Sequence, residues 1–189
     1  MPRLFTAFLL PEAVVDHLSD LELNMYGARW VDPDDYHVTL RFFGDVEGHV
    51  ADDIMAGLGA VHERMFEARV TGLGCFGGDK PRTLTAEIGA GPGLADLQRA
   101  TERVARSAGL PPERRNYSPH VTLARLDGTR PETVARFIQS FGKARLEPFP
   151  VDSFVLMSAK PGSGGGPYVV EETFTLARSP WGTAHSAAD

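Results

Sequence analysis

The alternation of apolar and polar positions predicts a succession of strands and helices from the start of the chain. Residues Arg3–Leu10 are mostly apolar and end at a proline, which is typical of a buried strand. Residues Glu12–Met25 place valine, leucine and methionine at helical spacing, which indicates an amphipathic helix. Residues 36–43 are rich in β-branched and aromatic side chains and stop at Gly44, so we expect a second strand there.

The rest of the chain continues this irregular alternation. We expect further helices over 45–65, 94–108 and 131–141, and further strands over 66–73, 82–88, 120–126, 151–159 and 168–176, the last two forming a hairpin across the Gly162–Gly166 loop. Because hairpins are mixed with strand–helix units, the pattern favours an α+β fold over a doubly wound parallel sheet. No segment is typical of an interdomain linker, so we expect one domain over residues 1–176 and a frayed tail over 177–189.

Composition and charge exclude several classes of protein. The chain has 189 residues, of which 42% are hydrophobic, and it has no apolar run of the roughly 18 residues that cross a bilayer. Its single cysteine, Cys75, permits no intramolecular disulfide and no cysteine-based zinc site. The formal net charge of -6 argues against binding to long nucleic acid, although a site for one phosphate needs only a few local cations. We therefore expect a cytoplasmic protein that neither contacts membranes nor binds extended DNA. Because the sequence has no heptad repeats, we also expect a monomer.

One internal repeat changes this picture. The tetrapeptide His-Val-Thr-Leu occurs at residues 37–40 and again at residues 120–123, each time within a predicted strand. Because residues i and i+2 share one face of a strand, His37 and Thr39 project together, and so do His120 and Thr122. If two lobes are related by an approximate two-fold axis, these pairs lie on opposite sides of one cleft.

Such a set of side chains suits displacement at a phosphodiester. Two imidazoles can act as acid and base near neutral pH, and two hydroxyls can donate to the non-bridging phosphoryl oxygens. The chemistry requires no metal and no cofactor. The alternative is an internal duplication in which each histidine merely packs or caps, but two matched copies favour the chemical interpretation.

An arginine follows each tetrapeptide, at Arg41 and Arg125. In a regular strand Arg41 shares the face of His37 and can help to bind phosphate. Arg125 is five residues beyond His120, on the opposite face, and needs a bulge or the end of the strand to reach the cleft. On parity alone, Arg41 is the better candidate.

The paired motifs and their flanks resemble the 2H phosphoesterases, and specifically the RNA 2′,3′-cyclic phosphodiesterase branch, once called 2′-5′ RNA ligase. The resemblance extends over about residues 3–176, through segments 3–7, 28–31, 37–44, 73–76, 112–115, 119–125 and 151–156. It implies a bilobal α+β fold with a central cleft between two antiparallel sheets, related by a pseudo-two-fold axis, with the helices outside. One departure is Thr85, where family members often have an aromatic residue that would affect base preference.

The resemblance also implies roles for the residues. His120 would accept a proton from the attacking water, and protonated His37 would donate one to the departing ribose 3′ oxygen. Thr39, Thr122, Arg125 and Arg41 would bind the phosphate, and the product would be a 2′-phosphomonoester. Since the two motifs are nearly identical, the residues by themselves permit the acid and base roles to be exchanged.

The same site is compatible with other functions. It could cleave or ligate 2′-5′ linked RNA ends, act on a cyclic mononucleotide, or bind phosphorylated RNA ends without turnover, although binding alone has no need of two histidines. Arg114 and Arg115 precede the second motif and can steer phosphate, and four aromatic residues are candidates for base stacking or for core packing: Tyr36, Phe43, Phe76 and Tyr117.

Overall fold

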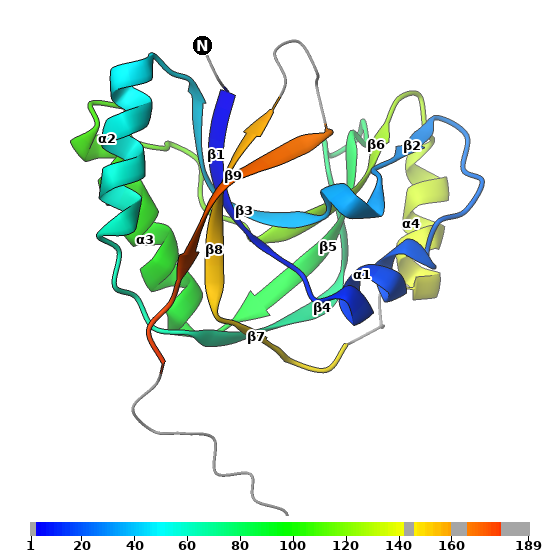
Figure 1. Ribbon diagram of the computed structural model, residues 1–189. Coiled ribbons are helices and arrows are strands. Elements are labelled where there is room, and N and C mark those ends of the chain that lie inside the picture. Colours follow the sequence, from blue (N-terminus) through cyan, green and yellow to red (C-terminus); the bar gives the residue numbers. More distant parts are fainter. Residues whose placement is uncertain (1–2, 142–145, 160–165, 179–189) are drawn as a thin grey trace, which may run out of the picture.

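The computed structural model describes residues 3–141, 146–159 and 166–178 (Figure 1). Its strands form one nine-stranded sheet, in which β7, β4, β5, β6, β3, β1, β8 and β9 are successive neighbours and β2 pairs with β6. The strands are β1 (Arg3–Leu9), β2 (Ala28–Trp30), β3 (His37–Asp45), β4 (Phe66–Phe76), β5 (Thr83–Ala90), β6 (His120–Leu126), β7 (Phe149–Val151), β8 (Ser153–Ala159) and β9 (Tyr168–Thr175). The helices are α1 (Glu12–Ser19), α2 (Gly48–Gly59), α3 (Pro92–Ser107) and α4 (Pro131–Phe141), with a 3₁₀ turn at Pro33–Asp35.

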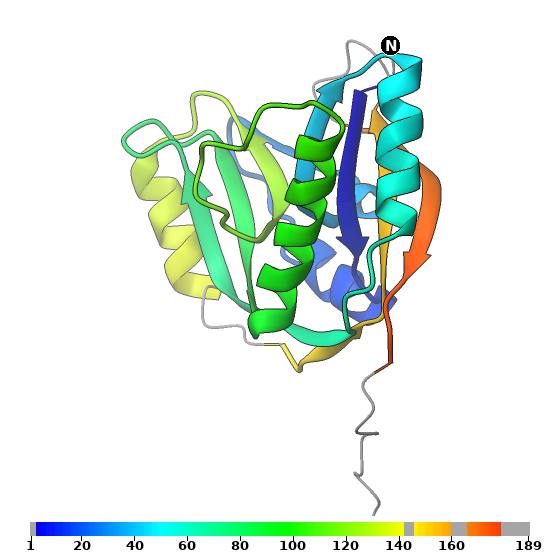
Figure 2. The same cartoon turned by 90° about the vertical axis from the view of Figure 1, so that its left-hand side faces the viewer.

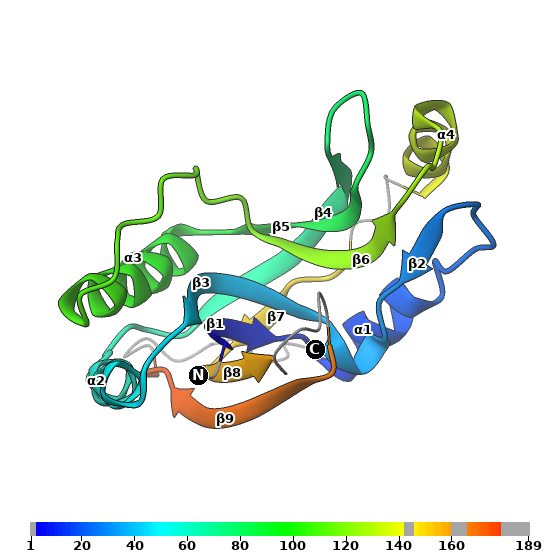
Figure 3. The same cartoon turned by 90° about the horizontal axis from the view of Figure 1, so that it is seen from above.

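The sheet consists of two related halves that meet at β3 and β6. In one half β1 and β3 are antiparallel neighbours joined through α1, and in the other β5 and β6 are antiparallel neighbours joined through α3. A single residue pair, Val38 with Val121, joins β3 to β6. Figure 3 shows the half with β4, β5 and β6 diverging from the half with β1, β8 and β9. The α+β fold and its two antiparallel lobes are therefore confirmed, with the two sheets joined into one at this pair.

The helices pack on the sheet around the larger of two hydrophobic clusters. Helices α2 and α3 contact each other (Figure 2), and α3 contacts both β3 and β4, so it bridges the two halves. The core includes fully buried residues of both motif strands, such as Val38 and Val121, together with Leu97 of α3. No helix in the described ranges is long and apolar enough to cross a membrane.

Several predicted boundaries are confirmed and others are wrong. The strand over 120–126, the helix over 131–141 and the β8–β9 hairpin are observed. The helix predicted over Glu12–Met25 ends at Ser19, although Leu21 and Met25 are buried in the segment that follows. Their burial in irregular structure imitates helical periodicity, because spacing records which residues are buried and not the backbone conformation.

The helix predicted over 45–65 is also shorter, because its ends serve other elements. Asp45 is the last residue of β3, where it pairs with Arg3 of β1, and α2 extends only over Gly48–Gly59. The strand predicted over 66–73 continues to Phe76. The predicted Gly162–Gly166 loop lies outside the described residues, except for Gly166. The predicted tail lies outside them from residue 179 onward. Its first residue, Ala177, forms a β-bridge with Arg64.

Candidate active site

A cleft of about 1110 Å³ lies where the two halves meet, and both motifs contribute to its lining. His37 and Thr39 reach it from β3, and His120, Thr122 and Arg125 reach it from β6. Since β3 and β6 are neighbours in the sheet, residues 83 positions apart in the sequence share one cavity. The structure thus brings together the two histidines and two threonines of the predicted site.

Each histidine is oriented by a backbone carbonyl two residues earlier. Nδ1 of His37 lies 2.7 Å from the carbonyl oxygen of Asp35, and Nδ1 of His120 lies 2.7 Å from that of Ser118. A carbonyl only accepts, so each Nδ1 must donate, and in a neutral ring Nε2 keeps its lone pair. Both imidazoles therefore have Nε2 available for proton transfer.

Matching β-bulges decide which arginine belongs to the cleft. In the β1–β3 register Ala7 pairs with Thr39 but Thr6 pairs with Arg41, so Leu40 is an extra residue. In the β5–β6 register Thr85 pairs with Thr122 but Leu84 pairs with Ala124, so Leu123 is extra in the same way.

Each bulge reverses the alternation of side chains after the threonine. Arg125 therefore lies on the face of His120 and Thr122, and the equivalent residue of the first motif is Phe42. Arg41 lies on the opposite face, equivalent to the buried Ala124. The prediction that Arg41 shares the face of His37 is wrong, and the bulge that Arg125 requires is present.

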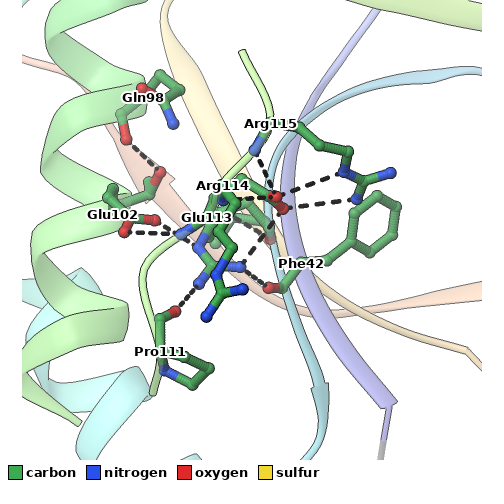
Figure 4. A network of polar contacts seen from close by, with 10 residues as sticks. Phe42, Gln98, Glu102, Pro111, Glu113, Arg114 and Arg115 are labelled. Atoms are coloured by element: carbon green, nitrogen blue, oxygen red, sulfur yellow. Dashed lines mark hydrogen bonds and ion pairs between the residues drawn. The ribbon is translucent and has the colours of Figure 1, made fainter. Parts of the chain in front are cut away.

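Arg41 instead belongs to a buried polar network with Glu102, Phe42 and Pro111, three residues that Figure 4 labels. Its side chain is only 8% exposed, and its Nε donates to Oε2 of Glu102 in α3 at 2.5 Å. The two terminal nitrogens donate to the carbonyl oxygens of Phe42 and Pro111, at 2.5 and 2.6 Å. With these partners Arg41 connects β3 to α3 and to the segment after α3, and three of its five N–H groups are engaged although the residue also borders the cleft.

His37 has an apolar and aromatic environment. Its ring lies 5.0 Å from that of Phe5 and 5.1 Å from that of Tyr168, measured between centroids. Burial lowers the pKa of His37, the Asp35 carbonyl acts in the opposite direction, and the nearby His120 and Arg125 lower it further. Burial also raises the pKa of Tyr168, and Arg125 opposes that effect. Arg125 therefore acts electrostatically on both residues from the other half.

His120 is bordered by an aromatic residue of β4. The ring centroids of Phe76 and His120 are 4.8 Å apart in a T-shaped arrangement, and Phe76 is 43% exposed. Thr85, where family members often have an aromatic residue, is buried opposite Thr122. Phe76 thus supplies an aromatic surface in the cleft from the neighbouring strand.

The other aromatic candidates divide between core and cleft. Tyr36 and Phe43 are buried in the core, and burial raises the pKa of Tyr36 to about 12. Tyr117 lines the cleft and its hydroxyl donates to the carbonyl oxygen of Thr39 at 3.0 Å, while burial raises its pKa as well. Phe42, which the sequence reasoning did not select, is half-exposed and also lines the cleft.

Sequence reasoning missed Arg29 of β2. This residue lines the cleft and is the direct cross-strand partner of Arg125, and neither arginine has an ion pair within the described residues. Like charges opposite each other on adjacent strands repel, so the pair favours an anion placed between them. The pairing of β2 with β6 could not be predicted, because β2 has only three residues. Within the described ranges no three His, Cys, Asp or Glu residues are grouped as metal ligands would be.

Comparison with known proteins extends these findings. The sequence model of the 2′-5′ RNA ligase superfamily matches residues 10–162. An RNA 2′,3′-cyclic phosphodiesterase of Aquifex aeolicus is 27% identical over 177 residues, which cover 91% of this chain and 94% of that protein. One of Methanothermobacter thermautotrophicus is 32% identical over 68% of this chain and 73% of its own length. One of Aeropyrum pernix is 38% identical, but over only 53% of this chain and 58% of that protein.

Solved structures agree in fold. The crystal structure of TT0787 of Thermus thermophilus is 27% identical and aligns with a TM-score of 0.75, covering 92% of this chain and 97% of that one. E. coli LigT complexed with 3′-AMP aligns with a TM-score of 0.71 at 21% identity, over 93% and 99% of the two chains, and so supports the fold alone. The match of the superfamily's sequence model to most of the chain, on the fold that places both motifs in one cleft, shows that this protein belongs to the 2′-5′ RNA ligase superfamily.

Proposed function

We propose that the protein is an RNA 2′,3′-cyclic phosphodiesterase, which hydrolyses cyclic phosphate ends of RNA or oligonucleotides to 2′-phosphomonoesters without a metal. The observation that carries the proposal is the matched pair of histidines. Each holds Nδ1 on a backbone carbonyl and keeps Nε2 available, and both line one cleft together with Thr39 and Thr122. The names of the relatives from Aquifex and Methanothermobacter support the choice of substrate.

In the proposed reaction Nε2 of His120 accepts a proton from water as the water oxygen bonds to phosphorus. The bond from phosphorus to the ribose 3′ oxygen breaks, and protonated His37 donates its Nε2 proton to that oxygen. The phosphate remains on the 2′ oxygen, and proton exchange with solvent restores both histidines. Hydroxyls of Thr39 and Thr122 donate to the non-bridging oxygens, and Arg125 balances the charge that develops there.

The lowered pKa of His37 makes its protonation depend on the substrate. Burial favours the neutral ring in the free protein, whereas an anionic phosphate beside Nε2 favours the imidazolium. The proton that His37 donates is then taken up as substrate binds. Because the two motifs are alike, the assignment of acid and base rests on the family resemblance, and the pH profiles of the single variants test it.

The test is turnover of an oligonucleotide with a 2′,3′-cyclic phosphate end in the presence of EDTA. Replacement of either His37 or His120 by Ala removes an acid or base, which is expected to lower kcat about 10²–10⁴-fold. His49→Ala is a matched control, since that residue is exposed and outside the cleft. Activity within tenfold of the wild type in both single variants would contradict the mechanism, and loss of activity in EDTA that added metal restores would contradict metal independence.

A second candidate uses the same site on 2′-5′ linked RNA, by cleavage or by ligation of RNA ends, and the name of the matching superfamily favours including it. Hydrolysis is the favoured direction because water enters an exposed cleft freely. A 2′-5′ dinucleotide assayed beside the cyclic phosphate substrate separates these activities. Tight binding of both substrates without turnover would instead indicate a binding module.

A further inference from the structure

Residues 110–119, in the segment between α3 and β6, form one wall of the cleft. Five of its residues line the cavity: Glu113, Arg115, Asn116, Tyr117 and Ser118. Side-chain contacts attach the segment to β3 near both of its ends. Arg41 donates to the carbonyl oxygen of Pro111 at 2.6 Å, and the Tyr117 hydroxyl donates to that of Thr39 at 3.0 Å. The position of this wall therefore depends on the first motif strand.

The buried network of Arg41 continues along this segment. Oε2 of Glu102 accepts from Arg41, and Oε1 of the same carboxylate accepts from the backbone N–H of Glu113 at 3.2 Å. Nη1 of Arg41 also lies 4.0 Å from Oε2 of Glu113. Glu102 thus holds the backbone of Glu113, and Arg41 forms a longer ion pair with its side chain; Figure 4 labels both glutamates.

Glu113 in turn holds Arg115. Its Oε1 accepts from the backbone N–H of Arg115 at 3.1 Å and from Nε at 3.4 Å, and Oε2 accepts from Nη2 at 3.5 Å. The hydrogen bonds from Arg115 hold the pKa of Glu113 below its usual value, so this carboxylate is ionised at neutral pH. The Arg115 side chain is 82% exposed, and two of its five N–H groups bind Glu113, which leaves three for a ligand.

We infer that Arg41 is a positioning residue that acts through Glu113 on Arg115, and that Arg115 binds the phosphate next to the reacting end of an RNA strand. This inference rests on the proposed function. Arg125 lies with the histidines, where it serves the reacting phosphate, whereas Arg115 belongs to a separate wall of the same cleft. An oligonucleotide carries a second phosphate and a cyclic mononucleotide does not, so the network confers a preference for RNA ends over mononucleotides.

The test compares kcat/KM for a trinucleotide with a 2′,3′-cyclic phosphate end and for a 2′,3′-cyclic mononucleotide. We expect Arg115→Met to lower the trinucleotide-to-mononucleotide ratio about fivefold, because exposed ionic contacts are weak. Arg41→Met should lower the ratio by a similar factor, mainly through KM of the trinucleotide. If Arg41 acts through Arg115, the trinucleotide-to-mononucleotide ratio of the double variant is no lower than that of either single variant. The ratio of Arg41→Lys should lie between those of Arg41→Met and the wild type, since lysine keeps the charge but lacks the planar guanidinium that binds three oxygens.

Arg103→Met is the matched control, because Arg103 of α3 pairs with Glu63 and neither residue lines the cleft. Circular dichroism confirms that each variant is folded at the assay temperature. Equal losses on both substrates, additive effects in the double variant, or an unchanged ratio in Arg115→Met would overturn the inference. Absence of turnover of either substrate by the wild-type protein would instead contradict the proposed function.

Discussion

His37 and His120 occupy equivalent positions in two related strands, but their cross-strand neighbours differ in chemistry. On β1, the residues opposite His37, Thr39 and Phe42 are the apolar Leu9, Ala7 and Phe5. On β5, the residues opposite His120, Thr122 and Arg125 are the polar Glu87, Thr85 and Thr83. One half of the site is therefore apolar and the other polar, which gives two identical side chains different environments and permits different roles.

The apolar environment of His37 predicts a pH dependence of stability. Its folded-state pKa is lowered below the unfolded value of 6.5, so below about pH 6.5 the unfolded chain takes up a proton that the folded protein resists. Relative to His37→Gln, the wild-type protein should lose stability as the pH falls from 7.5 through 6.5, and level off below the folded-state pKa. Urea unfolding of both proteins at several pH values measures this difference. If the difference in the free energy of unfolding between the wild type and His37→Gln is constant with pH, His37 is not desolvated.

Arg29 and Arg125 predict an effect on phosphate binding. The two residues are cross-strand partners and both line the cleft, so an anionic ligand relieves the repulsion between their charges. We expect Arg125→Met to lower kcat/KM by about 10²-fold or more, as for loss of a group that stabilises transition-state charge. Arg29→Met should raise KM more than it lowers kcat.

The matched control for these substitutions is Arg99→Met, because Arg99 pairs with Asp96 on the exposed surface of α3. Steady-state kinetics on the same cyclic phosphate substrate measures all three variants. An Arg29 variant that binds and turns over substrate like the wild type would show that the cross-strand pair has no part in binding.

At the scale of elements, the two β-bulges determine which side chains of β3 and β6 face the cleft. Leu40 and Leu123 each add one residue to a strand, and both are buried in the core. Each leucine is followed by a second buried residue, Arg41 or Ala124. A regular strand alternates its faces, so the bulge is what allows two consecutive residues to be buried. As a result Arg125 enters the cleft and Arg41 enters the helix interface, which is the reverse of what regular alternation predicts.

The packing of α3 predicts a local effect on stability. A Cβ added at Gly93, in the first turn of α3, would lie 2.6 Å from Cβ of Phe66 and 3.0 Å from its Cγ. Gly93→Ala should therefore destabilise the protein by about 1–3 kcal/mol through overpacking. Gly59→Ala is the control, since it is helical with nothing within 4 Å, and should stabilise α2 by about 0.5–1 kcal/mol. Equal midpoints of urea unfolding for the two variants would contradict this account of the contact.

For the whole molecule, the shared core makes the two halves interdependent. Only Val38 and Val121 pair across β3 and β6, yet the core cluster contains residues of both halves, and α3 contacts both. A site between the halves is then rigid because the core, and not the sheet hydrogen bonds, holds them together.

This interdependence predicts a single unfolding transition that a ligand of the cleft shifts as a whole. A 2′-phosphomononucleotide, the class of product in the proposed reaction, at about 100 times its Kd should stabilise the folded state by about 2.7 kcal/mol. Near-ultraviolet and far-ultraviolet circular dichroism should report the same midpoint with and without it. Two transitions, or a shift in only one of the two signals, would show that the halves unfold separately.

Local sequence pattern was sufficient to predict the fold class, most of the elements and the four central residues of the candidate site. The repeated tetrapeptide indicated those four residues, because strand alternation places each histidine on the face of its threonine. The strand over 120–126 and the helix over 131–141 could be predicted from local propensity and from the residues that begin or end each element, because these signals act within a few residues.

The roles of the arginines depended instead on tertiary packing. The bulges at Leu40 and Leu123 depend on how each strand packs against the core, and the pairing of Arg29 with Arg125 depends on contact between strands far apart in the chain. The first helix likewise ends at Ser19, although burial continues to Met25. Local pattern records which residues are buried, whereas register and pairing are set by all elements together, and these place Arg125 on the face of the histidines and Arg41 on the opposite face.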